Sequence, residues 1–221
     1  MKIGIIGTGN IGGTLARRFA TLGHDIALAN SRGPETLTDL ARETGARAVT
    51  VHDAARAGDV VIVAIPQKAI ASLPPDLFSG VPDDVVVVDT GNYYPQQRDG
   101  AIEAIEAGTS ESRWVAEHLK RPVVKTFNNI YAQHLMEKGS PKGAAGRIAL
   151  PVAGEDARAK TVVIGLLDEL GFDGVDAGAL DESWRQQPGT PVYGSDRDAD
   201  GVRAALAAAL PERTAEWRAA K

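Results

Sequence analysis

The sequence contains no cysteine among its 221 residues. This absence excludes disulfide-stabilised scaffolds, thiolate zinc sites, cysteine-ligated iron–sulfur clusters and cysteine nucleophiles. The sequence also lacks the H-E-x-x-H spacing of zinc proteases and the G-x-S-x-G turn that carries a serine nucleophile in hydrolases. We therefore predict no metal site.

The chain also lacks a basic run and a long apolar run. Its 24 Lys and Arg residues against 29 Asp and Glu residues give a net charge of −5 at pH 7, and general nucleic-acid binding needs clustered cations. The N-terminal apolar run over residues 1–6 is too short for a signal peptide, and no run approaches the roughly 20 residues of a membrane span. We expect a cytoplasmic protein whose partners are small molecules, with no nucleic acid and no membrane.

Short β-rich runs alternate with segments of helical spacing over the first part of the chain. Runs such as Val60–Val63 and Val85–Val88 do not alternate with polar residues, which is typical of strands covered on both faces, as in a parallel sheet. This order predicts an α/β fold with a doubly wound, mostly parallel sheet of the Rossmann type. The predicted strands are Ile3–Ile6, Asp25–Ala29, Ala46–Val51, Val60–Ile65, Val85–Asp89 and Pro122–Phe127.

The later part continues this pattern less regularly. We predict a strand over Arg147–Ala153, a helix over Glu155–Leu170, a strand over Phe172–Asp176 and an Ala-rich helix over Asp200–Leu210. Residues between 179 and 200 look irregular. We therefore divide the chain into a nucleotide-binding domain over residues 1–178 and a small C-terminal segment over residues 179–221.

A Gly-rich turn carries the strongest chemical signal. Residues 7–12 read G-x-G-x-x-G, directly after a predicted strand and at the start of a predicted helix. In this context the glycines allow a tight turn, close approach of the backbone to a pyrophosphate, and helix–strand packing. The alternative is an ordinary Gly-rich turn. We predict dinucleotide binding by Gly7, Thr8, Gly9, Asn10, Ile11 and Gly12.

The residues that follow the second predicted strand indicate which dinucleotide binds. NAD-selective sites commonly place Asp or Glu at this position, whereas this chain reads Asn30-Ser31-Arg32. A hydroxyl and a guanidinium suit the 2′-phosphate of NADP. The alternative makes Arg32 a solvated loop residue. We predict NADP(H) as the cofactor, with Asn30, Ser31 and Arg32 in its site.

Three polar loops follow the next strands at the same predicted sheet edge, where ligands bind in open parallel sheets. Gly91 and Pro95 could equally be plain turn residues. From these loops we assign Ile65, Pro66, Gln67, Asn92 and Asn128 to the cofactor and Asn129 and Tyr131 to the second substrate. His134 lies one helical turn further on, although a packed or solvated histidine is the commoner case. Trp184 and Trp217 are expected to pack.

Several short motifs together resemble the NADP-dependent deazaflavin (coenzyme F420) oxidoreductase family. They are Gly-Thr-Gly-Asn-Ile-Gly, Asn30-Ser31-Arg32, Lys125-Thr126-Phe127-Asn128, and the stretch from Pro151–Gly154 to Val175–Gly178. The resemblance extends from the start to about Tyr193. The segments Asn92–Pro95 and Asp181–Pro191 depart from the pattern and look like a bacterial branch, whose acceptor need not be a deazaflavin. The nucleotide domain is also similar to the oxidoreductase domains of ferric reductases.

The resemblance implies a homodimeric NADPH-dependent oxidoreductase that exchanges a hydride between NADP(H) and a flavin-like or deazaflavin acceptor. By motif match, Thr8, Ser31 and Arg32 would contact the NADP adenosine and phosphates, and the Asn128–Tyr131 loop would lie beside the nicotinamide. Imine, pyrroline and β-hydroxyacid reductases resemble the first half but add a large helical domain, for which the residues after Gly178 are too few. We assign no catalytic side chain, because hydride chemistry belongs to the cofactor. An NADP(H) sensor without turnover and a ferric-chelate reductase stay open as alternatives.

Overall fold

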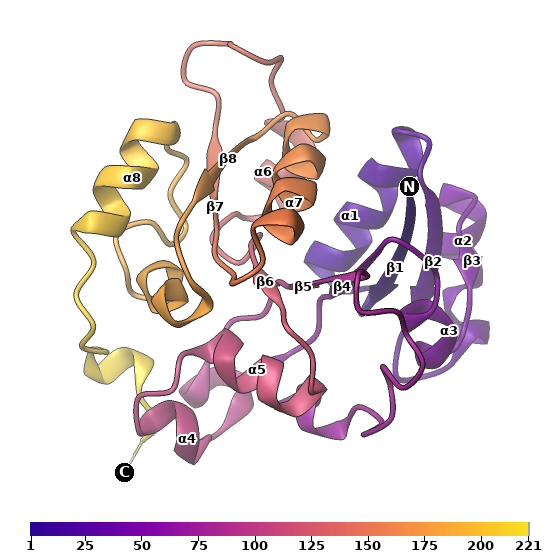
Figure 1. The fold of residues 1–221 in the computed structure, drawn as a ribbon, viewed down its shortest axis with the longest axis horizontal. Helices are drawn as coiled ribbons and strands as arrows, with labels where there is room; N and C mark the ends of the chain where they lie inside the picture. Colours follow the sequence, from indigo (N-terminus) through magenta and orange to yellow (C-terminus); the bar gives the residue numbers. More distant parts are fainter. Residues whose placement is uncertain (221) are drawn as a thin grey trace.

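The computed structural model describes residues 1–220, and six parallel strands form its main sheet in the order β3-β2-β1-β4-β5-β6. This order confirms the predicted doubly wound α/β fold. In Figure 1 the first half of the chain lies on the right and the later elements on the left. The strands are β1 (Lys2–Ile6), β2 (Asp25–Ala29), β3 (Arg47–Ala48), β4 (Val60–Val63), β5 (Val86–Asp89), β6 (Val124–Lys125), β7 (Ala149–Val152) and β8 (Asp173–Asp176).

Both faces of the main sheet are buried, as the unbroken apolar runs predicted. Successive side chains of a strand point to opposite faces, so Val60 and Ile62 enter one core cluster while Val61 and Val63 enter another. Helices cover each face. The α-helices within residues 1–220 are α1 (Asn10–Thr21), α2 (Thr38–Thr44), α3 (Val51–Ala55), α4 (Glu103–Glu106), α5 (Glu111–Leu119), α6 (Ala132–Glu137), α7 (Ala157–Glu169) and α8 (Ala199–Ala207).

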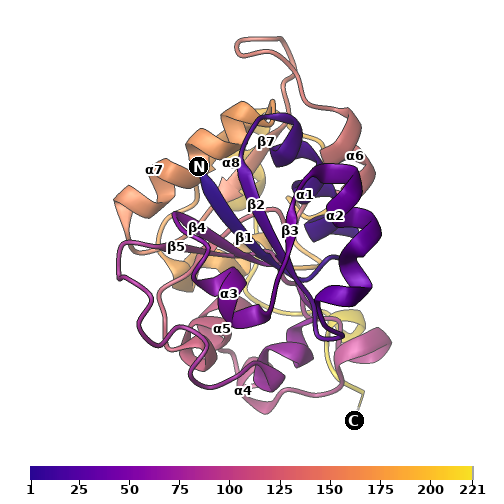
Figure 2. The same ribbon diagram turned by 90° about the vertical axis from the view of Figure 1, so that its right-hand side faces the viewer.

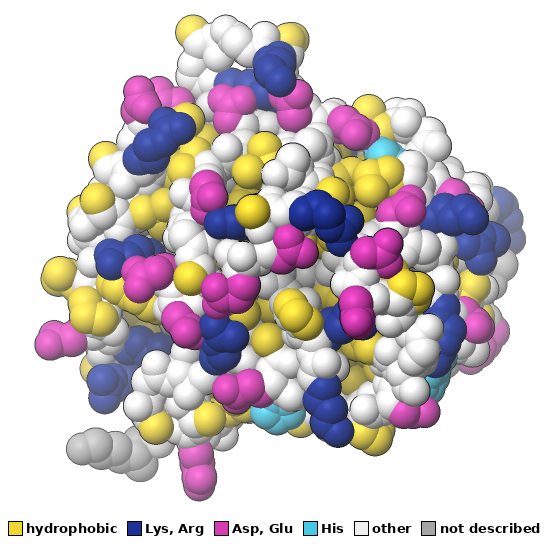
Figure 3. Space-filling view, in the orientation of Figure 1, with side chains coloured by type: hydrophobic (Ala, Val, Ile, Leu, Met, Phe, Trp, Pro, Cys, Tyr) yellow, Lys and Arg dark blue, Asp and Glu magenta, His cyan; other side chains and the backbone are white. Residues whose placement is uncertain are grey.

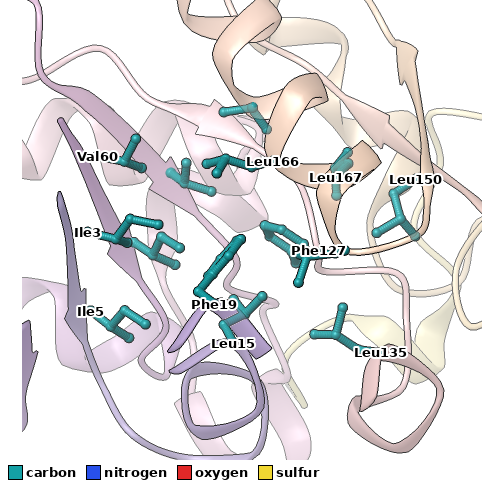
Figure 4. Close-up of a cluster of buried hydrophobic side chains, with 14 of the residues drawn as sticks. Ile3, Ile5, Leu15, Phe19, Val60, Phe127, Leu135, Leu150, Leu166 and Leu167 are labelled. Atoms are coloured by element: carbon teal, nitrogen blue, oxygen red, sulfur yellow. The ribbon is translucent and has the colours of Figure 1, made fainter. Parts of the chain in front are cut away.

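The larger cluster joins the first and later halves of the chain. Figure 4 shows Phe19 of α1 lying between Ile3 of β1 and Phe127, the second residue after β6. Leu166 and Leu167 of α7 belong to the same cluster. The first half of the chain therefore packs directly against the β7–α7–β8 unit.

A second, two-stranded parallel sheet pairs β7 with β8. An antiparallel bridge between Lys125 and Ala153 connects it to β6. Val202, Ala205 and Leu206 of α8 pack against this small sheet in a third cluster. The strand–helix–strand order predicted for this region is confirmed.

Two predicted strands are reduced to two residues each in the structure, each for a local reason. The run Ala46–Val51 pairs only over β3, because the Thr50 side chain accepts a hydrogen bond from the Asp53 backbone and starts α3 at Val51. The run Pro122–Phe127 pairs only over β6, and Phe127 then adopts a left-handed backbone with φ of 63°. The stretch predicted to be irregular contains a 3₁₀ helix over Leu180–Gln186.

The surface view shows acidic and basic side chains intermingled on one face of the molecule (Figure 3). Within residues 1–220, no helix is long and apolar enough to cross a membrane.

Candidate functional site

The turn between β1 and α1 has the geometry that its glycines predict. Gly7 has φ of 100°, and a Cβ there would lie 2.3 Å from the Ala64 carbonyl oxygen. A Cβ on Gly12 would lie 1.9 Å from the Gly7 carbonyl oxygen, so α1 and β1 could not approach as they do. Around Gly9, by contrast, a Cβ would meet no atom within 4 Å. Gly9 therefore borders open space at the start of α1.

That open space belongs to a cavity of about 420 Å³ at the carboxyl end of the sheet. It lies where the strand order reverses between β1 and β4, the place at which this fold binds dinucleotides. The structure brings together in its lining the predicted residues Gly7, Thr8, Gly9, Asn30, Ser31, Arg32, Ile65 and Pro66. Asn10, Ile11 and Gly12 form the first turn of α1 behind it, with no acidic residue among them.

The turn after β2 is ordered by its own asparagine. The Asn30 side chain accepts a hydrogen bond from the Arg32 backbone at 2.9 Å and donates to the Thr36 hydroxyl at 2.9 Å. Ser31 and Arg32 are exposed, and within residues 1–220 the Arg32 guanidinium forms no ion pair. An exposed cation without an ion-pair partner, in the same cavity lining as Gly9 at the start of α1, suits a phosphate.

Sequence reasoning missed one carboxylate at this turn. A Cβ built on Gly33 would lie 2.4 Å from Glu35 Oε1, so the Glu35 side chain folds back over the residue after Arg32. Glu35 thus places an acidic group close to the turn that we assign to the 2′-phosphate. The sequence does contain an indication of this contact: Pro34 begins a 3₁₀ helix, and the second residue of that helix, Glu35, lies beside the turn that precedes it.

The remaining predicted cofactor residues link the neighbouring loops to one another. Gln67 is fully buried, and its amide nitrogen donates to the Glu111 carbonyl at 3.0 Å. The Asn92 amide nitrogen donates to the Asn128 carbonyl at 2.8 Å, and the Asn128 amide nitrogen donates to Asn92 Oδ1 at 3.1 Å. Gln67 therefore joins the loop after β4 to the start of α5, and the Asn92–Asn128 pair joins the loops after β5 and β6. None of the three side chains lines the cavity.

The two predicted substrate residues have contrasting environments. Asn129 is buried, and neither polar atom of its side-chain amide has a hydrogen-bond partner among the described residues. Leaving a buried polar group unpaired costs about 1–3 kcal/mol. Phe127, two residues earlier, holds a left-handed backbone that is strained for an aromatic residue. Tyr131 is 57% exposed. The loop after β6 thus combines strain, an unsatisfied amide and an exposed aromatic ring.

Buried charges support the loop after β5. Glu111 is fully buried, and its carboxylate accepts hydrogen bonds from the Arg213 guanidinium at 2.7 Å and from the Tyr93 backbone N–H at 3.1 Å. Burial raises the pKa of Glu111, while the Arg213 and Lys125 cations oppose that rise. Sequence reasoning missed Arg213, because nothing in the spacing of a C-terminal arginine indicates a partner 102 residues away.

His134 and Trp184 do not line the nucleotide cavity. His134 faces Asp196, with 2.9 Å between Nδ1 and Oδ1. Trp184 lies beneath Arg185, whose guanidinium carbon is 4.4 Å from the ring centre. Trp217 packs as expected, with Tyr94 and Tyr193 as its neighbours.

The strand order, the Gly-rich turn and the cavity at the sheet's switch point define a dinucleotide-binding protein of the Rossmann class. Structures with low sequence identity share this fold. A reductive aminase from Aspergillus terreus, solved in complex with NADPH, has a TM-score of 0.55 at 16% identity, over 93% of this chain and 59% of that one.

Residues 2–93 match the family described as "NADP oxidoreductase coenzyme F420-dependent". A protein from Sinorhizobium meliloti, described as hypothetical protein SMa0349, is 33% identical over 89% of this chain and 94% of that one, with a TM-score of 0.74. A "putative f420 dependent nadp-reductase" from Arthrobacter sp. FB24 is 26% identical over 81% of this chain and 85% of that one, with a TM-score of 0.66. The chain belongs to this family of NADP oxidoreductases.

A curated relative matches a shorter region. The Escherichia coli (strain K12) protein YjhV is 40% identical over 80 residues, which is 36% of this chain and 51% of that protein. This match therefore spans about half of that protein's length.

Proposed function

We propose that this protein transfers a hydride between NADP(H) and a flat, flavin-like or deazaflavin acceptor. The observation that carries the proposal is the cavity between the Gly-rich turn and the Asn30–Arg32 turn, in a chain of an NADP oxidoreductase family. The residues present fit NADP(H): Gly9 borders open space, the first turn of α1 has no carboxylate, and the Arg32 guanidinium forms no ion pair within residues 1–220.

Each part of the cavity has a role in this proposal. The Gly7–Gly9 backbone and the N-terminal end of α1 bind the pyrophosphate, where N–H groups and the helix dipole favour an anion. Ser31 and Arg32 bind the 2′-phosphate. Ile65 and Pro66, at the end of β4, lie along the cofactor towards β5.

When bound, NADPH supplies the hydride, two electrons with one proton, and a proton from water completes reduction of the acceptor. The protein's own contribution is orientation. The Asn92–Asn128 hydrogen bonds fix the loops after β5 and β6 relative to each other, and the buried Glu111 holds the Tyr93 backbone. Flat rings must meet within near-attack distance, roughly 3–3.5 Å, so a rigid sheet edge favours transfer.

NADPH oxidation by the purified protein tests the proposal, with riboflavin, FMN, FAD, coenzyme F420, a quinone and chelated ferric iron as separate acceptors. We expect turnover with at least one flavin or deazaflavin and little with NADH. The matched control is Gly9→Val, which should lose turnover while staying folded. Binding of NADPH without oxidation by any acceptor would favour a sensor, and turnover with chelated iron alone would favour a ferric-chelate reductase.

A further inference from the structure

The C-terminal segment, here residues 211–218, folds back onto the loop after β5. Arg213 reaches inwards and donates to Glu111 at 2.7 Å and to the side-chain oxygen of Gln187 at 2.7 Å. Its guanidinium carbon lies 5.3 Å from the centre of the Tyr93 ring. Glu111 holds the Tyr93 backbone as well, so a single buried carboxylate fixes both the loop and the returning segment.

A second tether joins the same two parts of the chain. The Gln96 side-chain nitrogen donates to the carbonyl oxygens of Ala215 and Arg218, at 2.9 Å and 2.8 Å. Figure 2 shows the yellow C-terminal segment below the sheet, at the end towards which β1 and β2 run. The segment is therefore attached at the sheet edge where ligands bind in this fold.

These tethers place three aromatic rings together, which we name the aromatic wall: Tyr94, Tyr193 and Trp217. The Trp217 ring centre lies 6.0 Å from that of Tyr94 and 6.1 Å from that of Tyr193. The two tyrosine hydroxyls are hydrogen-bonded to each other at 2.5 Å. The wall therefore combines residues from the loop after β5, from the stretch before α8 and from the C-terminal segment.

The aromatic wall lies one strand beyond the nucleotide cavity. A Cβ on Gly91 would lie 3.7 Å from the carbonyl oxygen of Ile65, a residue that lines the cavity. Tyr94 follows Gly91 in the same loop. Because Arg32 marks the phosphate end of the cofactor beside β2, the nicotinamide end belongs on the opposite side of the crevice, towards β4 and β5.

Three cations at this edge are each paired with a carboxylate whose side chain is at most 1% exposed. The pairs are Arg98 with Asp99, Lys125 with Asp89, and Arg213 with Glu111. An edge of aromatic rings backed by paired charges favours stacking of a flat ring over capture of an anion.

We propose that the aromatic wall binds the ring system of the hydride acceptor, with Trp217 as the residue that determines acceptor affinity and Arg213 as a positioning residue that holds Trp217. This inference rests on the proposed function, and it names the surface on which the hydride acceptor would bind. Stacking of a heterocycle on an aromatic side chain contributes enough that its loss should weaken binding roughly 10-fold or more.

The test measures riboflavin binding directly, by quenching of its fluorescence, and NADPH binding separately. Riboflavin carries the ring without a phosphate. We expect Trp217→Leu to raise the Kd for riboflavin roughly 10-fold and Trp217→Phe to retain most of the affinity, with the Kd for NADPH unchanged in both. Arg213→Lys, which keeps the charge beside Glu111 but loses the forked contact with Gln187, should raise the Kd for riboflavin and the KM while kcat stays within about twofold.

Trp114→Phe, at a core residue of α5, is the matched control and should leave both constants unchanged. If folded Trp217→Leu binds riboflavin like the wild type, the inference is overturned while the proposed function stands. If the wild type binds riboflavin through Trp217 but never oxidises NADPH with any acceptor, the proposed function fails and the assignment of the wall as a ring-binding surface stands.

Discussion

Lys125 and Asp89 form an ion pair at the carboxyl ends of β6 and β5, with 3.1 Å between Nζ and Oδ2 and with side chains 0% and 1% exposed. They are register partners in the parallel ladder. Asp89 also accepts from the Ser112 hydroxyl at 2.7 Å and from the Gly91 backbone at 2.8 Å, while Lys125 donates to the Gly91 carbonyl. The pair therefore shapes the turn that begins the loop after β5.

Breaking this pair should destabilise the protein strongly. Removing one partner of a buried ion pair costs about 3–5 kcal/mol, because the other charge is left uncompensated. We expect Lys125→Met to lower the free energy of unfolding in urea by about this amount, and Asp89→Asn added to it to recover part of the loss. Lys142→Met, which removes an exposed ion pair with Asp168, should change little. A loss for Lys125→Met no larger than that control's would contradict the assignment.

Substitutions at Gly9 and Gly12 should have different effects on NADPH binding and on stability. Gly9→Val should abolish NADPH binding while the melting temperature stays near that of the wild type, because its φ of −73° suits any residue and its Cβ would point into open space. Gly12→Ala should lower the melting temperature, since its Cβ would meet the Gly7 carbonyl oxygen. Calorimetry and NADPH titration of both variants check this. Normal NADPH affinity in folded Gly9→Val would refute the site.

Arg32 should discriminate between the two nucleotides. A hydrogen bond to a charged group contributes about 1.5–3 kcal/mol, so Arg32→Ala should raise the Kd for NADPH roughly 10- to 100-fold. NADH lacks the 2′-phosphate, so its Kd should change little. Asn30→Asp should act in the same direction by repelling the phosphate. Equal losses for both nucleotides would mean that Arg32 supports the turn and does not contact the phosphate.

Glu35 should oppose the binding of NADPH. Its carboxylate folds over Gly33, beside the residues assigned to the 2′-phosphate. We expect Glu35→Gln to lower the Kd for NADPH several-fold at low salt, with little effect on NADH, and we expect the gain to shrink as salt screens the repulsion. Asp39→Gln, on the exposed surface of α2, is the control. An unchanged NADPH affinity at every salt concentration would exclude this repulsion.

Arg213 should control a pH-dependent part of stability. Burial raises the pKa of Glu111, and Arg213 opposes that rise, so Arg213→Met should raise this pKa further. A raised carboxyl pKa means that the folded state binds the proton more tightly. The protonated carboxyl therefore makes its full contribution to the free energy of unfolding at pH values below its ordinary pKa of 4.5. This contribution is lost as pH rises through the raised pKa of the folded state.

The stability difference between wild type and Arg213→Met should therefore grow as pH rises from the raised pKa of the wild type to the higher pKa of the variant, towards about 3–5 kcal/mol. Urea unfolding at several pH values measures it. The double variant Arg213→Met with Glu111→Gln has no carboxyl to titrate and should lose the extra pH dependence. A difference that is constant with pH would show that Glu111 does not titrate in this range.

The fold was predictable because it depends on local patterns. Unbroken runs such as Val60–Val63 indicate strands buried on both faces, and the G-x-G-x-x-G spacing fixes a turn whose clashes involve only adjacent elements. The same reasoning located the Asn30–Arg32 turn, since it directly follows β2.

Long-range side-chain contacts were not predictable. Nothing local distinguishes Gln67 or Asn128, which bind other loops, from residues that line the cavity. Arg213 and Glu111 are 102 residues apart in the sequence, and no local pattern of residue types predicts their contact. The short β6 likewise depends on the left-handed conformation of Phe127, which residue types alone do not favour.

The antiparallel bridge at Lys125 has a dynamic consequence. The Lys125 backbone N–H donates to the Ala153 carbonyl at 2.8 Å, and the Lys125 carbonyl accepts from the Ala153 N–H at 3.1 Å, so the residue that neutralises Asp89 also joins the two sheets. Sliding of the β7–β8 unit against the main sheet would have to break this bridge and disturb the loop after β5. The amides of Lys125 and Ala153 should therefore exchange with solvent deuterium at one common rate, as a single cooperative unit.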